Sequence, residues 1–359
     1  MKTRKVAIGG LVIGGGSPVA VQSMCNTRTK DVKATVEQIK RLTDLGCEII
    51  RCGIPDMESA KALAKIKSKI KIPLVADIHY DYKLAIESFK SGADKIRINP
   101  GNIGSQEKVK AVIDAAKEHN AAVRIGVNAG SLKTDPAYKL PESSGIAKVD
   151  KMVSSLMEHI DFFEKNSFTN IVVSLKAHDV PETLAAYRLF NKLKDYPLHI
   201  GITEAGTAYS GLIKSSVGLG ILLNEGLGDT MRVSLTADPE EEIYPAYKIL
   251  SSLGLRKVGV ELISCPTCAR TEINVIKLAR DVEKMTMKIK KPLKIAVMGC
   301  SVNGPGEAKD ADLGVSGGKG VGLIFKGGDI IKRVPKKDLL KEFEKELKKL
   351  LSQKPKAKS

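Results

Sequence analysis

The stretch KIRINPGNIGSQEKVKAVIDAAKEHNAAVRIGVN, residues 95–128, contains two short β-branched runs separated by a helical pattern. The first run is KIRINP (95–100), the helical segment is SQEKVKAVIDAAKEHN (105–120), and the second run is AVRIGVN (122–128). A strand, a crossover helix and a second strand form the βαβ unit from which parallel sheets are built. This stretch therefore predicts one repeat of a parallel α/β fold.

The same alternation extends along the chain in both directions. Helical patterns such as DVKATVEQIKRLTDLG (31–46) separate the runs, and an inserted loop, SLKTDPAYKLPESSG (131–145), lengthens one interval. Eight alternations with right-handed crossovers predict a (β/α)8 TIM barrel. A doubly wound open sheet is the alternative, but no G-x-G-x-x-G follows a strand and opens a helix. The eight predicted strands are 19–24, 48–53, 74–79, 95–100, 122–128, 171–176, 198–206 and 231–236.

Polar side chains occupy the ends of these strands, although buried parallel strands are usually apolar throughout. Residues two apart share a face of a strand. If these faces point inward, four arginines and a lysine meet at the carboxyl-end mouth of the barrel, with only Asp77 and Glu204 as acids. The surplus of positive charge favours a phosphate-bearing ligand. The residues concerned are Arg51, Asp77, His79, Arg97, Asn99, Arg124, Asn128, Ser174, Lys176, Glu204, Arg232 and Ser234.

A further phosphate contact is predicted after the seventh strand. The segment GLIKSSVG (211–218) supplies Lys214, Ser215 and backbone amides. TIM barrels often bind phosphate near strands seven and eight, where backbone N–H groups point at the ligand.

A smaller α+β domain is predicted to follow the eighth helix, which spans about 239–252. From Gly259 onward the order is strand, helix (CARTEINVIKLARDVEKM), strand (LKIAVMGC), glycine-rich hairpin and a last amphipathic helix. Cys265 and Cys268 are expected at the start of the first helix, where free amides and the helix dipole lower a thiol pKa. Cys300 ends the second strand. The expected domains are a substrate-binding barrel at 1–254, a cysteine-bearing domain at 258–350 and a basic tail at 351–359.

The three cysteines Cys265, Cys268 and Cys300 suggest a metal centre that lacks a fourth cysteine. A thioredoxin-like pair does not explain Cys300, and a structural zinc site requires a further Cys or His that this part of the chain does not contain. Glu307 closes the loop after Cys300 and supplies an oxygen. Because a carboxylate is an exchangeable ligand, the pattern favours an iron–sulfur cluster over zinc. Cys25, Cys47 and Cys52 are expected to be buried small side chains.

Composition and charge limit the possible function classes. The 359 residues carry a formal charge of +17, which raises nucleic acid as a partner, but aromatic residues make up only 4% and tryptophan is absent. No apolar run is long enough to span a membrane, and the short N-terminal apolar stretch reads as a hairpin turning at Gly9-Gly10. A cytoplasmic protein with reduced thiols is expected.

Eight motifs, in order along nearly the whole chain, resemble those of the bacterial 4-hydroxy-3-methylbut-2-enyl diphosphate synthases. They are VQSMCNT, ADIHYDY, IRINPGNIG, RIGVNAGSL, GITEAG, GDTMRVSLT, SCPTCAR and GCSVNGPGEA. Cys25 and Arg28 stand where this family is expected to have threonine and an acidic residue. The chain is similar to the compact two-domain bacterial form, without the extra central domain of plant-type members.

The resemblance implies a [4Fe–4S] cluster on Cys265, Cys268, Cys300 and Glu307, in a domain resembling one of the sulfite reductases. It implies that Asp77 and Glu204 act near the reacting carbons and that Asn303 lies beside the cluster. The cations implied to hold the diphosphate are Arg51, Arg97, Arg124, Lys176 and Arg232.

The implied reaction is a two-electron reductive ring opening of 2-C-methyl-D-erythritol 2,4-cyclodiphosphate. Electrons are expected from an acidic carrier, flavodoxin or ferredoxin, and a head-to-tail homodimer is expected in which each cluster domain caps the partner's barrel. A zinc-stapled barrel with lyase or isomerase activity on a phosphosugar, and a non-enzymatic RNA-binding protein, remain alternatives.

Overall fold

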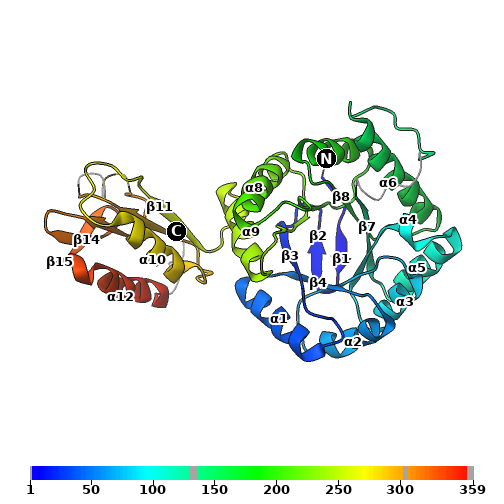
Figure 1. The fold of residues 1–359 in the computed structure, drawn as a ribbon, viewed down its shortest axis with the longest axis horizontal. Helices are drawn as coiled ribbons and strands as arrows, with labels where there is room; N and C mark the ends of the chain where they lie inside the picture. The colour runs from blue at the N-terminus through cyan, green and yellow to red at the C-terminus, as the bar shows by residue number, and fades with distance from the viewer. Residues whose placement is uncertain (1, 129–135, 302–305, 307, 354–359) are drawn as a thin grey trace. The chain divides into compact units, whose positions relative to one another are not determined.

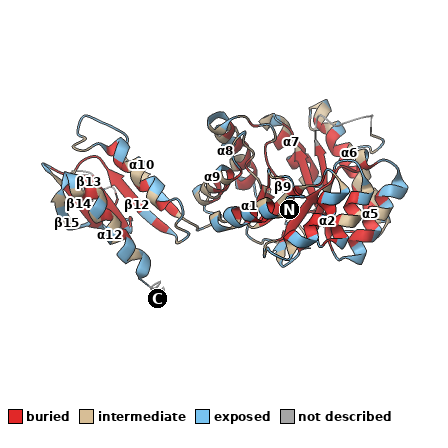
Figure 2. Cartoon of the chain, turned by 60° about the horizontal axis from the view of Figure 1, so that its bottom comes forward, coloured by how far each residue is buried: buried red, intermediate tan, exposed pale blue. Residues whose placement is uncertain are grey.

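The computed structural model describes residues 2–128, 136–301, 306 and 308–353. The chain forms two compact units, Met1–Arg256 and Lys257–Ser359. Each unit has its own buried core (Figure 2). None of the described helices is long and apolar enough to cross a membrane.

The first unit is a ring of eight parallel strands surrounded by helices (Figure 1). Each strand pairs with the next in the order β8-β7-β6-β5-β4-β3-β10-β9, and a bridge between Val173 and Leu198 joins β8 to β9. The predicted TIM barrel is therefore confirmed. The strands are β3 (Ala20–Met24), β4 (Ile49–Gly53), β5 (Leu74–Asp77), β6 (Lys95–Ile98), β7 (Ala122–Asn128), β8 (Ile171–Lys176), β9 (His199–Ile200) and β10 (Thr230–Met231).

The barrel helices begin where polar residues can satisfy their free backbone amides. The side chains of Asp31, Asp56, Asp81 and Asp179 each accept a hydrogen bond from an amide in the first turn of a helix. These caps define where a strand-to-helix loop at the mouth ends. The helices are α1 (Val32–Leu45), α2 (Met57–Lys67), α3 (Tyr82–Lys90), α4 (Pro100–Ile103), α5 (Gln106–Glu118), α6 (Ala147–Lys165), α7 (Val180–Leu193), α8 (Ala208–Asn224) and α9 (Glu240–Ser252).

The seventh and eighth strands are much shorter than the sequence predicts. Strand β9 ends at Ile200, and at the next residue, Gly201, a side-chain carbon would lie 2.6 Å from Lys176 Nζ and 2.9 Å from the Arg232 carbonyl oxygen. The residues after Gly201 instead form the mouth loop that carries Glu204.

The hairpin of β1 (Val6–Ile8) and β2 (Leu11–Ile13) closes the amino end of the barrel. It turns at Gly9-Gly10, as predicted. Val6, Ile8 and Ile13 form one buried cluster with inward residues at the amino ends of the strands, among them Ala122 and Val172. In Figure 1 the hairpin lies across the centre of the ring. The described hairpin therefore forms an apolar floor opposite the mouth.

The second unit is a five-stranded mixed sheet with two long helices packed on it. Strands β11, β12 and β13 are parallel, and β13, β14 and β15 are antiparallel. Val275, Leu278 and Val282 form a buried apolar stripe on the first helix. The elements are β11 (Val260–Ser264), α10 (Val275–Thr286), β12 (Leu293–Met298), β13 (Leu313–Gly317), β14 (Val321–Lys326), β15 (Asp329–Pro335), a 3-10 helix (Lys336–Asp338) and α12 (Leu339–Ser352).

Candidate functional site

Five cationic side chains meet at the carboxyl-end mouth of the barrel. Four project from strands β4, β6, β7 and β8, and the fifth follows β10 directly. Burial is tightest at Arg124, whose exposed fraction is 1%. The predicted convergence is therefore present in the structure, although their role in binding stays a prediction. The five are Arg51, Arg97, Arg124, Lys176 and Arg232.

Asp77 is the acid at the centre of one side of this mouth. Its carboxylate lies 3.4 Å from Arg97 Nη1, 3.9 Å from Arg51 Nε and 3.6 Å from His79 Nε2. Burial alone raises the pKa of Asp77, but the neighbouring Arg51 and Arg97 outweigh it and lower the pKa below its usual value. Asp77 therefore stays ionised and holds two arginines in the mouth.

A second acid, Glu242 on α9, neutralises Arg232. The guanidinium donates from Nε and Nη2 to the two carboxylate oxygens, each at 3.0 Å. Glu242 also accepts a hydrogen bond from the Leu235 amide at 3.1 Å and is 2% exposed. This buried bidentate pair leaves Arg232 Nη1 directed at Met24 Sδ, 3.6 Å away. Arg51 Nη2 lies 2.8 Å from the same sulfur.

Arg124 and Lys176 have no acid partner of this kind among the residues that the structure describes. Burial, with Arg51 and Arg97 adding to it, lowers the pKa of Arg124 well below its usual value. Burial, followed by the charge of Arg124, lowers the pKa of Lys176 in the same way. Positive charge is thus compensated on the β4–β5–β10 side of the mouth and left uncompensated on the β7–β8 side.

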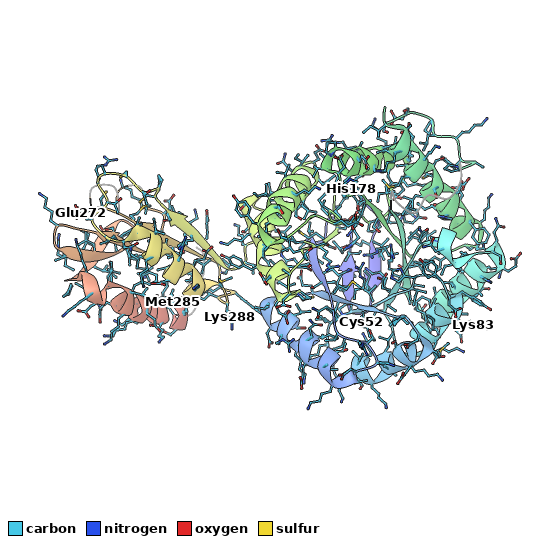
Figure 3. All side chains as sticks on the ribbon, viewed as in Figure 1. Cys52, Lys83, His178, Glu272, Met285 and Lys288 are labelled. Atoms are coloured by element: carbon cyan, nitrogen blue, oxygen red, sulfur yellow. The ribbon has the colours of Figure 1, made fainter. Side chains whose placement is uncertain are left out.

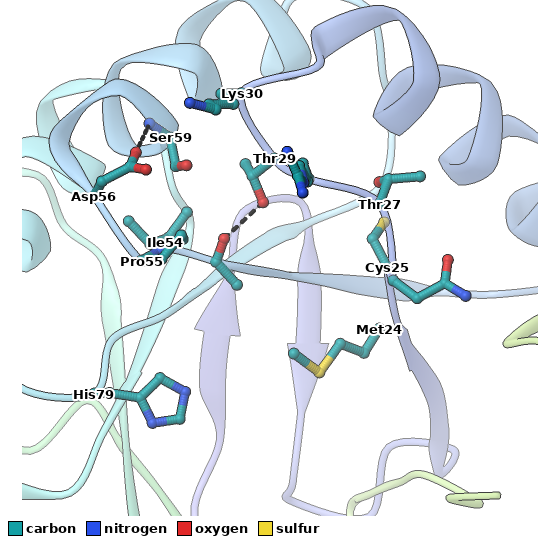
Figure 4. Close-up of a pocket in the computed structure, with 13 residues that line it drawn as sticks. Met24, Cys25, Thr27, Thr29, Lys30, Ile54, Pro55, Asp56, Ser59 and His79 are labelled. Carbon is teal, nitrogen blue, oxygen red and sulfur yellow. Dashed lines mark hydrogen bonds between the residues drawn. The ribbon is translucent and has the colours of Figure 1, made fainter. Parts of the chain in front are cut away.

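A pocket of ≈520 Å³ adjoins the compensated side (Figure 4). It is lined by the loops that follow β3 and β4, and Met24 and His79 form its border with the mouth. Thr29 donates to the Gly53 carbonyl oxygen at 2.6 Å and ties the two loops together. The pocket therefore adds space for a ligand beside the barrel mouth.

Three further predicted residues lie around the mouth. Asn99 is buried and caps α4, where its Oδ1 accepts from the Gly101 amide at 3.2 Å. Ser234 is half-buried in the segment after β10. Glu204 is exposed and has a φ of 51°, a left-handed conformation that costs free energy for a residue other than glycine. Such strain is typical of functional loops.

The segment 211–218 does not form the loop that the sequence predicts, and its role in phosphate binding stays a prediction. It lies inside α8, and its amides are therefore engaged in helical hydrogen bonds; Gly211, for example, donates to the Thr207 carbonyl at 2.7 Å. Lys214 is half-buried, and Ser215 is fully buried with no partner for its hydroxyl among the described residues. Asn128 ends β7, but its side chain lies outside the described part of the chain.

In the second unit, the three cysteines lie at the carboxyl edge of the sheet. Cys265 follows β11 and Cys300 comes two residues after β12, the parallel neighbour of β11. The Gly299 amide donates to Cys265 Sγ at 3.1 Å. The Glu272 amide donates to the Gly299 carbonyl at 2.8 Å and folds the 265–272 loop back over the turn. Figure 3 marks Glu272 at this edge.

The prediction that Cys265 and Cys268 begin a helix is wrong. Helix α10 begins at Val275, capped by Asn274, and residues 265–274 form a loop. The pKa of Cys268 is nevertheless lowered, because the backbone and then the side chain of Arg270 donate hydrogen bonds to its sulfur. Local donors replace the expected helix dipole.

The predicted metal ligands lie only partly within the described residues. Within the described ranges, no three His, Cys, Asp or Glu side chains come close enough to hold one metal ion. The predicted residues Asn303 and Glu307 lie outside the described residues.

Sequence reasoning missed four residues in the barrel. Lys95 lies two positions before Arg97, so the period of two could have placed it on the same face. His199 is the first residue of the short β9 and gives no comparable signal. Met24 and Glu242 contact the mouth arginines through tertiary packing that no local pattern predicts.

Comparison with solved structures shows the barrel fold. A dihydropteroate synthase from Stenotrophomonas maltophilia has a TM-score of 0.52 at 15% identity, covering 70% of this chain and 98% of its own. At this identity the likeness concerns the fold alone.

The sequence comparisons are far more specific. The model of the GcpE TIM-barrel domain matches residues 3–247, and that of the GcpE protein C-terminal domain matches residues 261–349. A 4-hydroxy-3-methylbut-2-en-1-yl diphosphate synthase (flavodoxin) from Caldanaerobacter subterraneus is 56% identical over 98% of both chains. A protein of the same name from Ruminiclostridium cellulolyticum is 52% identical over 96% of this chain and 97% of its own. Matches of this extent, over both units, show that the chain belongs to the GcpE family.

Proposed function

We propose that this chain performs the two-electron reductive ring opening of a cyclic diphosphate in the mouth of its barrel. It is a flavodoxin-dependent oxidoreductase that makes 4-hydroxy-3-methylbut-2-en-1-yl diphosphate in the non-mevalonate isoprenoid pathway. The substrate proposed is 2-C-methyl-D-erythritol 2,4-cyclodiphosphate. Its conversion takes up two electrons and two protons, opens the ring and releases one water.

The observation that carries this proposal is the uncompensated positive charge at the mouth. Asp77 and Glu242 are already bound by Arg51, Arg97 and Arg232. Buried cations without counter-charges are costly, and a diphosphate supplies both the charge and the oxygen acceptors that they lack. Its hydrogen bonds fix the reacting carbons and stabilise the phosphate oxygen released on ring opening.

The protons are proposed to reach the substrate from acids at the mouth. Glu204 is exposed at the rim and is the better donor, because a carboxylic acid there can exchange protons with solvent. Asp77 is held ionised by its arginines, so we assign it to orienting Arg51 and Arg97 near the reacting carbons.

The cofactor proposed is a [4Fe–4S] cluster held by Cys265, Cys268, Cys300 and Glu307, with Asn303 nearby. When bound, it would supply the electrons one at a time. Anaerobic purification tests this: brown protein with about four iron and four sulfide per chain is expected. Colourless protein with one zinc per chain would contradict it and leave a zinc-stapled barrel.

The electron carrier is proposed to be steered by the second unit. Residues 257–359 hold 23 Lys or Arg and 12 Asp or Glu, so they contribute +11 of the total +17. An acidic carrier such as flavodoxin is attracted to this unit, and the rate of electron delivery should fall as salt concentration rises.

A homodimer is proposed because the first unit ends on the face opposite its mouth. Arg256 Nη1 donates to the Val19 carbonyl at 2.8 Å, and Nη2 lies 2.9 Å from Glu48. These two residues precede β3 and β4, so the chain leaves the barrel at its amino end. The three residues that lead to β11 span at most ~11 Å. This reach is too short to carry the second unit round to the mouth of its own barrel. The cysteine-bearing unit of a partner chain is not limited in this way and can cover that mouth.

The exposed face of α8 is proposed as part of that dimer contact. Tyr209, Ile213 and Val217 recur every fourth residue and are 81%, 53% and 50% exposed. An apolar groove of ≈420 Å³ lies beside them, between α8 and α9. Apolar side chains in one stripe on a helix are suited to packing against a second copy.

Subunit mixing tests the arrangement. A Cys300→Ser chain and an Arg124→Ala chain, each inactive alone, are combined and allowed to exchange. If the cluster serves the partner's barrel, each mixed dimer has one intact site, and activity should return to about a quarter of wild type. Mixed dimers that demonstrably form and remain inactive would show that each cluster serves its own chain.

A further inference from the structure

Lys95 is a buried lysine of the barrel that the proposed reaction does not use. It stands at the start of β6, paired in register with Val75 on β5 and Ala122 on β7, two residues that belong to the apolar floor. It shares the inward face with Arg97. Lys95 is 0% exposed, and its Nζ has no hydrogen-bond partner in the described part of the chain.

No acid in the described barrel interior is available to neutralise Lys95. The two charges that act on its pKa are both cations, Arg124 and then Arg51. Both acids are already engaged, Asp77 by Arg51 and Arg97, and Glu242 by Arg232. The charged or titratable groups facing the interior are Arg51 on β4, Asp77 on β5, Arg97 on β6, Arg124 on β7, Lys176 on β8, His199 on β9, and Arg232 after β10 with Glu242 of α9.

The layer around Lys95 also contains other polar groups that have no hydrogen-bond partners. Arg124 Nε and Nη1, both atoms of the Gln22 amide and His199 Nε2 are buried without partners among the described residues. Burial, and then the charges of Arg124 and Arg51, lowers the pKa of Lys95 well below its usual value. The amine is therefore stable without its proton while the mouth holds no anion.

A phosphate ligand reverses this electrostatic balance. A diphosphate seated on Arg124 and Lys176 brings several negative charges to cations that are poorly compensated. It neutralises the repulsion that acts on Lys95 and makes a protonated amine favourable. Lys95 is buried too deeply for an ion from solvent to reach its amine. Positive charge can therefore be gained at this position only by binding a proton.

We propose that a phosphate ligand enters the barrel together with a proton from solvent, and that Lys95 accepts that proton. The inference rests on the proposed function only in requiring that the mouth binds phosphate. By thermodynamic linkage, protonation of Lys95 strengthens ligand binding by the same factor by which the ligand strengthens protonation. The affinity for the ligand therefore falls as pH rises. The bound proton is held one layer beneath a reaction that consumes protons.

Calorimetric titration with inorganic pyrophosphate tests the proposal directly. The full chain is purified anaerobically and titrated at one pH between about pH 7 and 9, in buffers of different ionisation enthalpy, which yields the number of protons taken up. Wild type is compared with Lys95→Met, which keeps the length of the side chain but cannot accept a proton. The proton contribution of pyrophosphate itself cancels in this difference.

Two matched variants complete the design. Lys90→Met makes the same substitution at an exposed lysine near the end of α3 and should leave proton uptake unchanged. Lys176→Met removes the other buried lysine and shows whether it takes up a proton instead. If Lys95→Met does not fold, carbon-13-labelled lysine in the wild-type chain gives the titration of buried amines with and without pyrophosphate.

The expected result is that Lys95→Met takes up about one proton fewer than wild type and loses much of the pH dependence of affinity. Equal uptake in the two chains, uptake lost only in Lys176→Met, or no buried amine that titrates on binding would each overturn the proposal and leave the proposed function intact. Failure of wild type to bind pyrophosphate would contradict both.

Discussion

The barrel mouth and the cysteine-bearing edge of the second unit are built in opposite ways. In the barrel, side chains project from strands, are largely buried and carry opposed or surplus charges that the scaffold holds in place. At the edge of the second unit, the thiols lie on loops, and Cys268 is exposed. A site on strands is fixed before its ligand arrives, whereas a site on loops gains much of its order from the group that it binds.

Disabling the two regions separately tests whether the barrel mouth and the cysteine-bearing edge are independent of each other. Arg124→Met should weaken pyrophosphate binding roughly 10- to 100-fold, since it removes charge-assisted hydrogen bonds, and leave iron content unchanged. Cys300→Ser should lose most of the iron and leave pyrophosphate affinity unchanged. Iron analysis and calorimetry on both variants are the measurements. Loss of both properties in either variant would show that the two regions are not independent.

The buried pair of Arg232 and Glu242 tests whether the barrel site is held by its own scaffold. Glu242→Gln leaves a buried arginine without its counter-charge and should lower the free energy of unfolding by roughly 3–5 kcal/mol. Glu240→Gln is the matched control, because Glu240 lies on the same helix and pairs with Arg41, which is 58% exposed. That change should cost below about 1 kcal/mol. Urea denaturation distinguishes the two, and equal effects would mean that burial does not strengthen the pair.

Mild acidification should lower the stability of the first unit more than that of the second, because every histidine lies in the first unit. This effect is expected to be smaller than the preceding ones. Burial lowers the pKa of His159 to about 4. Its folded-state pKa lies below the unfolded value of about 6.5, so the unfolded state binds more protons between these values. Stability of the barrel is therefore complete above this window and is lost as pH falls through it.

Hydrogen exchange resolved by peptide measures this effect in each unit. Peptides from β7 should lose protection by up to about tenfold per pH unit below pH 6.5, while peptides from β12 change less. His159→Gln should flatten the response, and His119→Gln, at an exposed position, should not. An equal loss in the two units would contradict the assignment to histidine.

The sequence predicts the barrel well because the period of two ties each side chain to a face. Arg97, Arg124 and Lys176 all point inward as expected, since a one-residue shift would bury their apolar neighbours on the wrong side. Lys95 obeys the same rule and was overlooked only because it lies farther from the strand end. The same logic fails where strands are short, as at β9 after Ile200.

Other features depend on contacts that no local pattern encodes. Cys265 and Cys268 precede a good helical pattern, but the Glu272–Gly299 hydrogen bond and the packing of Thr271 on Gly299 hold their segment as a loop. Glu242 reaches Arg232 only through the docking of α9 on the barrel. Segment 211–218 looks like a glycine-rich loop, yet Gly211 and Gly218 are there because larger residues would meet Leu235 and Ile202.

The apolar floor made by the β1–β2 hairpin has a kinetic consequence. Val6, Ile8 and Ile13 fill the amino end of the ring, so among the described residues the barrel interior is closed at this end and is approached from the mouth. Whatever enters must leave by the same route, and the next molecule waits until the previous one has gone. The diphosphate product therefore competes with fresh substrate for the same entrance, and slow release of product would delay the next turnover.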